Sequence, residues 1–377
     1  MSEWATYTIS EVCRRFSSGK GITASQIFEI GAYPVFGGNG IRGYTDTYNF
    51  EGECAIIGRQ GAYCGNTKYF CGKAYMTEHA IVATANDEHN IGYIANLLSI
   101  MDLGQYQGQS AQPGLSVNTL SKIELKLPDK ETQDSIFSLL FSLDKKIALN
   151  KQINARLEEM AKTLYDYWFV QFDFPDANGK PYKSSGGEMV FDETLKREIP
   201  KGWEVKSLGD WAEIRKGTLI TEKTANTNGD IKVISAGVDF SYYHDVANRP
   251  KNTITISASG ANAGFVNFWR EPIFACDCTT ITNSVIGRTL YILNFLKIVQ
   301  DFIYQQARGS AQPHVYPKDI EGLKIIVPPD LLLKRFSEFV ENWNLKIANN
   351  EKQNHHLTQL RDFLLSMLMN GQVSVAE

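Results

Sequence analysis

The chain has 377 residues, of which 21% are charged, and its formal net charge is −4. This length exceeds what a single hydrophobic core usually organises, so we expect two globular blocks. The acidic balance argues against a protein that coats nucleic acid indiscriminately, although it is compatible with a local DNA-binding groove.

The composition predicts a cytoplasmic protein without a membrane segment. Residues 1–12 lack the charged and then apolar pattern of a secretion signal, and no apolar run reaches the roughly 20 residues that cross a bilayer. The six cysteines show no paired Cys-x-x-Cys spacing, as expected of thiols in a reducing compartment.

Residues 1–130 form the first block. Short β-branched and aromatic runs alternate with glycines there, which predicts a mostly β or α+β fold with a helix near residues 90–103. Pro128 and Asp129 close the block, and Asp129 or Thr132 can cap the helix that follows.

The sequence pattern of residues 131–172 predicts a long helix. Its seam positions alternate in steps of three and four, the spacing of a heptad repeat. These positions are Leu140, Leu143, Ile147, Asn150, Asn154, Leu157, Ala161, Leu164 and Trp168. So narrow a stripe cannot be buried by one helix alone, so we expect a partner helix.

Residues 173–202 are rich in proline, glycine and serine, and this composition predicts a loop-rich connector. Residues 203–330 then repeat the landmarks of the first block in the same order. The motif Ser-Ala-Gln-Pro begins at Ser110 and again at Ser310, and Pro128 corresponds to Pro328. Between these landmarks the blocks share little, so one scaffold carries two different surfaces.

Residues 331–371 repeat the helical seam 200 positions after its first occurrence. Asparagines recur at Asn350 and Asn354, whereas Arg361 stands where the first helix has Ala161. We therefore predict an α+β fold. Two β-rich blocks in tandem repeat are joined by two long antiparallel coiled-coil helices with pseudo-twofold symmetry.

The motifs YPVFGGNGIRGY (33–44), IIGRQGA (56–62), YWFVQFD (167–173) and PKGW (200–203), with the two Ser-Ala-Gln-Pro motifs, resemble the specificity subunit of type I restriction–modification enzymes. The resemblance implies that residues 1–130 and 203–330 are target-recognition domains, each reading half of a bipartite, asymmetric site in double-stranded DNA. The helices 131–172 and 331–371 would set the spacer and dock two methyltransferase subunits.

The same resemblance implies a non-catalytic chain without a cofactor. S-adenosylmethionine, ATP and Mg would then belong to the methyltransferase and restriction/translocase subunits. Enzyme signatures in this sequence are weak, since Gly19-Lys20 lacks the upstream glycine of a phosphate-binding loop and no methyltransferase Asn/Asp-Pro-Pro-aromatic motif occurs. Glu78-His79 and His355-His356 lack complementary ligand spacing, so no metal site is predicted.

Reading base edges and phosphates requires hydrogen-bonding side chains on exposed loops. The candidates in the first block are Arg42, Tyr44, Arg59, Gln60, Lys68, Gln107, Gln109, Ser110 and Gln112. Those in the second block are Lys216, Lys223, Tyr242, Tyr243, Asn262, Arg288, Gln306, Arg308, Ser310, Gln312 and His314. For each one, the alternative is a solvated loop side chain. The Ser-Ala-Gln-Pro motifs can likewise be structural turns instead of phosphate contacts.

Two further sets have alternatives. The asparagines Asn150, Asn154, Asn350 and Asn354 would fix the register of the helix pair, or would face a solvated groove. Tyr165, Trp168 and Phe169 would form a partner-docking surface, or would be core beneath the neighbouring domain. A structural adaptor with two protein-binding modules is the alternative function, and a self-sufficient nuclease or methyltransferase is disfavoured by the absent motifs.

Overall fold

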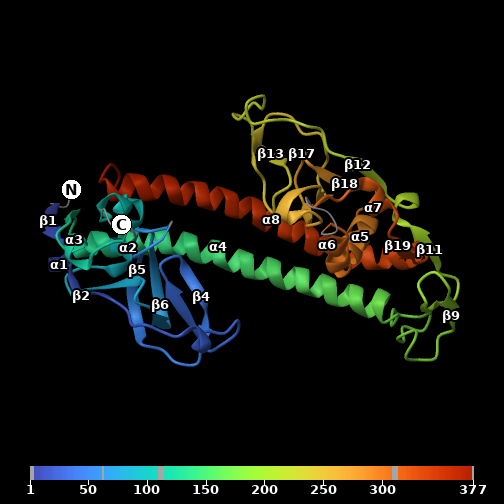
Figure 1. Ribbon diagram of the computed structural model, residues 1–377, viewed down its shortest axis with the longest axis horizontal. Coiled ribbons are helices and arrows are strands. Elements are labelled where there is room, and N and C mark those ends of the chain that lie inside the picture. Colours follow the sequence, from blue (N-terminus) through green and yellow to red (C-terminus); the bar gives the residue numbers. More distant parts are fainter. Residues whose placement is uncertain (1–3, 62, 109–113, 308–312, 376–377) are drawn as a thin grey trace. The chain divides into compact units, whose positions relative to one another are not determined.

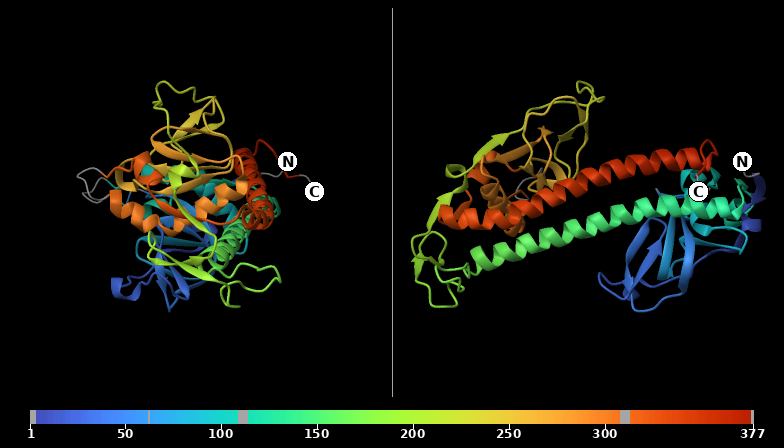
Figure 2. Two further views of the ribbon diagram at one scale, coloured as in Figure 1. Left: turned by 90° about the vertical axis from the view of Figure 1, so that its right-hand side faces the viewer. Right: turned by 180° about the vertical axis from the view of Figure 1, so that it is seen from behind.

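The computed structural model describes residues 4–61, 63–108, 114–307 and 313–375 (Figure 1). The chain divides into two compact units. Unit 1 consists of Met1–Ala148 and Asn354–Glu377, and unit 2 of Leu149–Gln353. The long helices α4 (Lys130–Tyr165) and α8 (Asp330–Met369) each contribute a segment to both units. Figure 2 shows each of them as a continuous helix, α4 in green and α8 in red.

Unit 1 contains a six-stranded sheet with the strand order β2-β7-β5-β6-β3-β4. All neighbouring strands are antiparallel except β3 and β6. The strands are β2 (Cys13–Ser18), β3 (Tyr33–Gly37), β4 (Gly40–Thr45), β5 (Phe50–Gly58), β6 (Thr67–Met76) and β7 (Ala80–Ala85). A separate antiparallel pair joins β1 (Ala5–Thr8) to β8 (Glu124–Leu127).

The helix predicted near residues 90–103 is present as α2 (Ile91–Ile100). Asn90 caps it, because its side-chain oxygen accepts a hydrogen bond from the backbone N–H of Tyr93 at 2.9 Å. The short elements of unit 1 are α1 (Ile9–Val12), η1 (Ala24–Gln26), η2 (Leu103–Tyr106) and α3 (Val117–Leu120).

The sheet of unit 1 buries both of its faces. Alternate residues of β5 point to opposite sides, so Ile57 packs with α2 while Ile56 packs with Met76. Leu368 and Met369, at the end of α8, are 2% and 3% exposed and complete the core on the α2 side. Residues from both ends of the chain's numbering therefore share one core.

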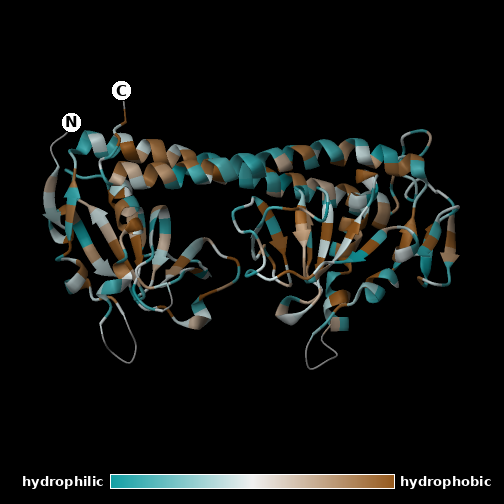
Figure 3. Ribbon diagram, turned by 90° about the horizontal axis from the view of Figure 1, so that it is seen from above, coloured by the Kyte–Doolittle hydropathy of each residue, from teal (hydrophilic) through white to brown (hydrophobic). Residues whose placement is uncertain are grey.

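Unit 2 contains a four-stranded sheet of order β12-β18-β15-β16 and a three-stranded sheet of order β14-β13-β17. The strands are β12 (Glu213–Lys216), β13 (Ile231–Ile234), β14 (Tyr242–His244), β15 (Thr253–Ser257), β16 (Val266–Trp269), β17 (Ile273–Ala275) and β18 (Cys278–Thr282). As in unit 1, a separate pair joins the start of the domain, β11 (Glu204–Ser207), to its end, β19 (Lys324–Val327). Hydrophobic and hydrophilic residues alternate along several strands in Figure 3.

The remaining elements of unit 2 are mostly helical. They are η3 (Asp166–Val170), η4 (Leu208–Asp210), η5 (Gly260–Asn262), α5 (Ile286–Ile298), α6 (Gln300–Ala307) and α7 (Pro317–Glu321). The predicted connector forms one hairpin of β9 (Met189–Asp192) and β10 (Arg197–Pro200).

Within each unit, α4 and α8 pack against one another in antiparallel orientation. In unit 1, Arg361 donates to Asp144 at 3.0 Å and Asn354 donates to the carbonyl of Ile147 at 3.4 Å. Contacts in unit 2 join Asn150 to Gln353 at 2.7 Å and Asn350 to Asn154 at 2.8 Å. Residue numbers fall along one helix as they rise along the other. The predicted fold class, with β-rich blocks and two packed helices, is confirmed.

Candidate nucleic-acid interface

The loops at one end of the unit 1 sheet are joined by backbone hydrogen bonds. Arg59, just after β5, donates its N–H to the carbonyl of His79 at 2.9 Å and accepts from the N–H of Leu115 at 2.9 Å. A Cβ added to Gly58 would lie 2.2 Å from the carbonyl oxygen of Gly38, so this close approach requires glycine. We call these joined segments, residues 38, 58–61, 63–65, 77–79 and 114–115, loop junction 1.

Unit 2 repeats this backbone arrangement. Ala258 donates to the carbonyl of Asp277 at 3.3 Å and accepts from Val315 at 3.0 Å. Gly264 donates to Ser257 at 2.8 Å, just as Gly65 donates to Gly58 at 2.8 Å. Ser257 replaces the glycine at position 58, and its hydroxyl donates to the carbonyl of Gly237 at 3.1 Å. Loop junction 2 consists of residues 237, 257–264, 276–277 and 314–315.

The matching hydrogen bonds identify equivalent positions whose side chains differ. The pairs are Arg59 with Ala258, Gln60 with Ser259, Tyr63 with Asn262, and His79 with Asp277. The chemistry of the side chains changes at every pair while the backbone bonds are kept. A common frame therefore presents two different sets of hydrogen-bonding groups.

The guanidinium of Arg59 forms hydrogen bonds within junction 1. Its guanidinium donates to the carbonyl of Leu115 at 3.2 Å and to Ser18 and the carbonyl of Glu78, both at 3.4 Å. These bonds hold Arg59 within the junction, and its contact with DNA stays a prediction. Arg59 ties the loops of the junction together.

Other predicted residues of unit 1 remain available near this junction. Gln60 bridges to Gly114 through the backbone, and Arg42 lies across Gly37 in the β3–β4 hairpin. Lys68 is exposed, with its ammonium 4.0 Å from where a Cβ on Gly40 would lie. Tyr44 in β4 and Gln107 after η2 are half-buried.

In unit 2, the structure brings Asn262 and His314 to junction 2. His314 bridges to Ser259, is exposed, and stacks on Tyr316 at 6.0 Å between ring centroids. The hydroxyl of Ser259 donates to the carboxylate of Asp277 at 2.5 Å. Lys216 is exposed where β12 ends.

Several predicted residues of unit 2 have other partners. Arg288, on α5, pairs with Asp330 at 2.9 Å and lies over the ring of Trp211 at 5.6 Å, and its contact with DNA stays a prediction. Tyr242 donates to the carbonyl of Ile220 at 2.9 Å, and burial raises the pKa of its hydroxyl. The remaining three are not among the residues of junction 2: Lys223 lies in an exposed loop, Tyr243 in β14 and Gln306 on α6.

Six predicted residues lie outside the described part of the chain: Gln109, Ser110, Gln112, Arg308, Ser310 and Gln312. Some of the described residues near these two segments belong to the junctions or contact them. Gly108 donates to the carbonyl of Gly114 at 3.2 Å, and the next residue, Leu115, belongs to junction 1. In unit 2 the described residue His314 bridges to Ser259 in junction 2.

Sequence reasoning missed His79 and Asp277 as members of the junctions. They follow β6 and β17, and they share neither residue type nor a recognisable motif. The one signal that could have found them was their spacing of 198 residues, close to that of the other repeated landmarks.

The aromatic residues at the end of the first helix are core residues. Tyr165, Trp168 and Phe169 are 3%, 4% and 3% exposed, and they pack with Tyr291 and Phe336 in unit 2. Such burial favours the alternative over partner docking, which stays a prediction. The alternative of core beneath the neighbouring domain describes them.

The seam asparagines are largely enclosed between the helices. Asn150 and Asn350 are 1% and 3% exposed, which argues against a solvated groove at these two positions. A buried amide without partners costs about 1–3 kcal/mol, so the bonds from Asn150 to Gln353 and from Asn350 to Asn154 penalise a shifted alignment. Their role in setting register stays a prediction.

Within the described residues, no group of three or more His, Cys, Asp or Glu side chains is placed to hold a metal ion. The same part of the chain has no helix long and apolar enough to cross a membrane. All six cysteines are free thiols.

Comparisons with known proteins agree with this architecture. The family model described as "Type I restriction modification DNA specificity domain" matches residues 1–159 and 200–359. The type I restriction enzyme MjaIX specificity subunit of Methanocaldococcus jannaschii is 28% identical over 310 residues, covering 76% of this chain and 69% of that protein. The EcoprrI specificity subunit of Escherichia coli is 41% identical over 141 residues, covering 36% and 35%.

Among solved structures, a type I restriction–modification S subunit from M. genitalium has the same fold. Its TM-score is 0.66 at 17% identity, and the match covers 97% of this chain and 96% of that one. Two matched segments, two β-rich units and two packed helices lead to one assignment. The chain belongs to the type I restriction–modification DNA specificity family, in which it is the non-catalytic DNA specificity subunit.

Proposed function

We propose that junctions 1 and 2 each read one half of a bipartite, asymmetric site in double-stranded DNA. The observation that carries the proposal is the shared backbone frame with different side chains, since equal frames dock on the same duplex geometry while different side chains select different bases. Identical surfaces on a pseudo-symmetric pair would instead read a palindrome.

The side chains of each junction suit base reading. In unit 1, Gln60 can pair with an adenine edge and Arg42 or Lys68 with guanine, while in unit 2 Asn262 can pair with adenine. The carboxylate of Asp277 can accept from cytosine N4. These assignments add His79, Ser259 and Asp277 to the candidate set, and they give less weight to Arg59 and Arg288, whose guanidinium groups have partners within the protein.

The remaining parts of the proposal concern the helices and the partners. Domains 1–130 and 203–330 would be held apart by the helices 131–172 and 331–371, with the connector 173–202 between them. Two methyltransferase subunits and the restriction/translocase subunits would carry S-adenosylmethionine, ATP and Mg, and the assembly would act in the cytoplasm. This chain itself would need no cofactor.

Exposed apolar side chains on the helices are a better docking surface than the buried aromatics. In unit 2 these include Leu149, Met160, Phe339 and Leu345, which are 50%, 48%, 50% and 57% exposed. Leu345→Glu should weaken retention of a methyltransferase subunit, because it places a charge in an apolar contact. The matched variant Asn342→Glu, on an exposed polar position of the same helix, should retain it.

Selection from random duplexes by the complex with the methyltransferase tests the reading function. We expect two fixed parts separated by a free middle. Gln60→Ala should relax one base position in one half-site, and Ser259→Ala one position in the other, each by about 1–3 kcal/mol of discrimination. Lys196→Ala, in the connector hairpin, is the control. Loss of preference in both half-sites from one substitution would contradict the proposal.

A further inference from the structure

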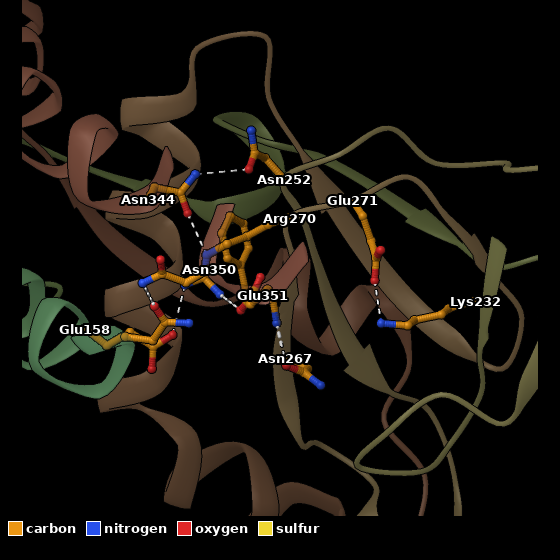
Figure 4. Close-up of polar contacts among 11 residues, drawn as sticks. Glu158, Lys232, Asn252, Asn267, Arg270, Glu271, Asn344, Asn350 and Glu351 are labelled. Atoms are coloured by element: carbon orange, nitrogen blue, oxygen red, sulfur yellow. Dashed lines mark hydrogen bonds and ion pairs between the residues drawn. The ribbon is translucent and has the colours of Figure 1, made fainter. Parts of the chain in front are cut away.

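Arg270, immediately after β16, links the second recognition domain to both long helices (Figure 4). Its side chain is 10% exposed. The guanidinium donates to Glu158 of α4 at 2.9 Å, to Glu351 of α8 at 2.8 Å and to Asn344 of α8 at 2.8 Å. It also lies over the ring of Phe268 at 5.2 Å. One residue of the domain thus contacts three acceptors on two helices.

A second bond ties the same edge of the domain to α8. The Asn344 amide donates to the side chain of Asn252 at 3.1 Å. Asn252 precedes β15 and Arg270 follows β16, and the adjoining residues Thr253 and Trp269 pair in the sheet. The two attachments therefore hold one end of a single strand pair.

In unit 1 the equivalent contact between the domain and the helices, which we call the joint, is made differently. The pairing of Ala55 with Tyr69 in β5–β6 corresponds to the pairing of Ile254 with Phe268 in β15–β16, which places Cys71 where unit 2 has Arg270. Cys71 is exposed. There, Tyr69 packs against Phe137 and Phe141 of α4 with ring centroids 4.9 and 5.6 Å apart, so the joint is aromatic.

The ionic joint is directional in a way that the aromatic one is not. A planar guanidinium offers donors in fixed directions, so rocking the domain breaks its bonds to Glu158, Glu351 or Asn344. Apolar packing is nearly indifferent to small rotations. Burial raises the pKa of Glu351, and the nearby carboxylates of Glu158 and Glu271 also raise it, whereas Arg270 lowers it. Without Arg270 the two helix carboxylates would face each other without a cation.

We propose that Arg270 is a positioning residue that fixes the angle of the second recognition domain on the helix pair, and thereby sets which spacer lengths the protein accepts. The inference rests on the proposed reading of a bipartite site. One extra base pair shifts a half-site by about 3.4 Å and turns it by roughly 34°. A domain held at a fixed angle rejects that change, whereas a domain that rocks tolerates it.

The experiment is site selection by the methyltransferase complex, using duplexes in which the spacer between two fixed half-sites varies by single base pairs. For the wild type we expect sites one base pair too long or too short to be recovered about tenfold less than the best site. For Arg270→Ala we expect that ratio to fall to about threefold or less, with the bases of both half-sites unchanged. Arg270→Lys keeps one charge but not the planar fork, so its ratio should lie between these.

The matched control is Lys232→Ala. Lys232 pairs with Glu271 at 2.6 Å and lies over Phe240, so its partner is next to Arg270 in sequence but its contacts stay entirely within the domain (Figure 4). This variant should keep the wild-type spacer profile. If Arg270→Ala does not assemble, Asn344→Ala is the second variant. It removes one acceptor of Arg270 and the bond to Asn252, leaves all charges in place, and should likewise widen the spacer profile.

The outcomes separate the inference from the proposed function. A wild-type complex that selects no bipartite site would overturn the proposed function and the inference with it. A bipartite wild-type site with an unchanged spacer profile for Arg270→Ala would overturn the inference alone. Equal widening by Lys232→Ala would also overturn it, because general loosening of the domain would then explain the effect.

Discussion

Replacing the amide pair between Asn350 and Asn154 tests whether it couples the two helices of unit 2. The Nδ2 of Asn350 donates to Asn154 at 2.8 Å, and Asn350 is 3% exposed. Changing either residue to leucine leaves the other amide without this partner in a mostly buried place, which should cost about 1–3 kcal/mol. Changing both to leucine creates an apolar seam pair, and this variant should be near the wild type or more stable.

Hydrogen exchange of backbone amides in residues 149–165 and 340–353 measures the local free energy of opening, which avoids assuming that two units unfold in one step. The double-mutant cycle should give a coupling free energy of about 1–3 kcal/mol. Asn342→Leu is the control, since Asn342 is exposed and donates only to Glu338 within α8. If the free energy of opening falls in the double variant by as much as the two single losses added together, the reasoning is refuted.

Four further results are expected. A fragment of residues 1–170 should self-associate, because its core lacks Leu368 and its helix lacks a partner, and light scattering showing only monomer at high micromolar concentration would contradict this. The isolated chain, with net charge −4, should bind DNA more weakly than the methyltransferase complex, and equal affinities and salt slopes in a salt titration would be the contrary result. One heptad inserted after Asn150 and another after Asn350 lengthen each helix by roughly 10 Å. Site selection should then find a spacer about 3 base pairs longer, or binding should be lost unless the DNA untwists. Tight binding at the original spacer would show that the helices do not measure the site. Burial raises the folded-state pKa of Glu351, so its ionisation lowers the free energy of unfolding as the pH rises from about 4.5 through the folded-state pKa. Urea unfolding should therefore show that Glu351→Gln becomes more stable relative to the wild type over this pH range. A relative loss of stability would contradict the prediction.

The fold was largely predictable because its strongest signals are periodic. The heptad seam and its recurrence 200 residues later follow from local spacing, and both helices and their antiparallel contacts agree with it. Capping of α2 by Asn90 is similarly local. Such features depend on residues a few positions apart or on a repeat that can be counted.

The site was predictable only in part, because its contacts join residues far apart in the sequence. Arg59 has the residue type of a base reader, yet Leu115, 56 positions away, accepts from it. Arg270 lies in no motif, and its acceptors are 74 to 112 positions away. Tyr165 shows a related ambiguity, since an aromatic residue at a helix end suits a core and an interface equally until burial is known.

The core of unit 1 has a consequence for synthesis of the chain. Leu368 and Met369 complete a core whose other fully buried members precede residue 141, so the ribosome must add more than 200 further residues before that core can close. At about 5–20 residues per second, this interval lasts roughly 10–40 s. During that time the nascent first domain exposes an apolar patch that its own later helix will cover. Folding of the first domain is thus completed only when the end of α8 packs onto it. Truncation there should leave the apolar patch exposed, so that chaperones bind the first domain.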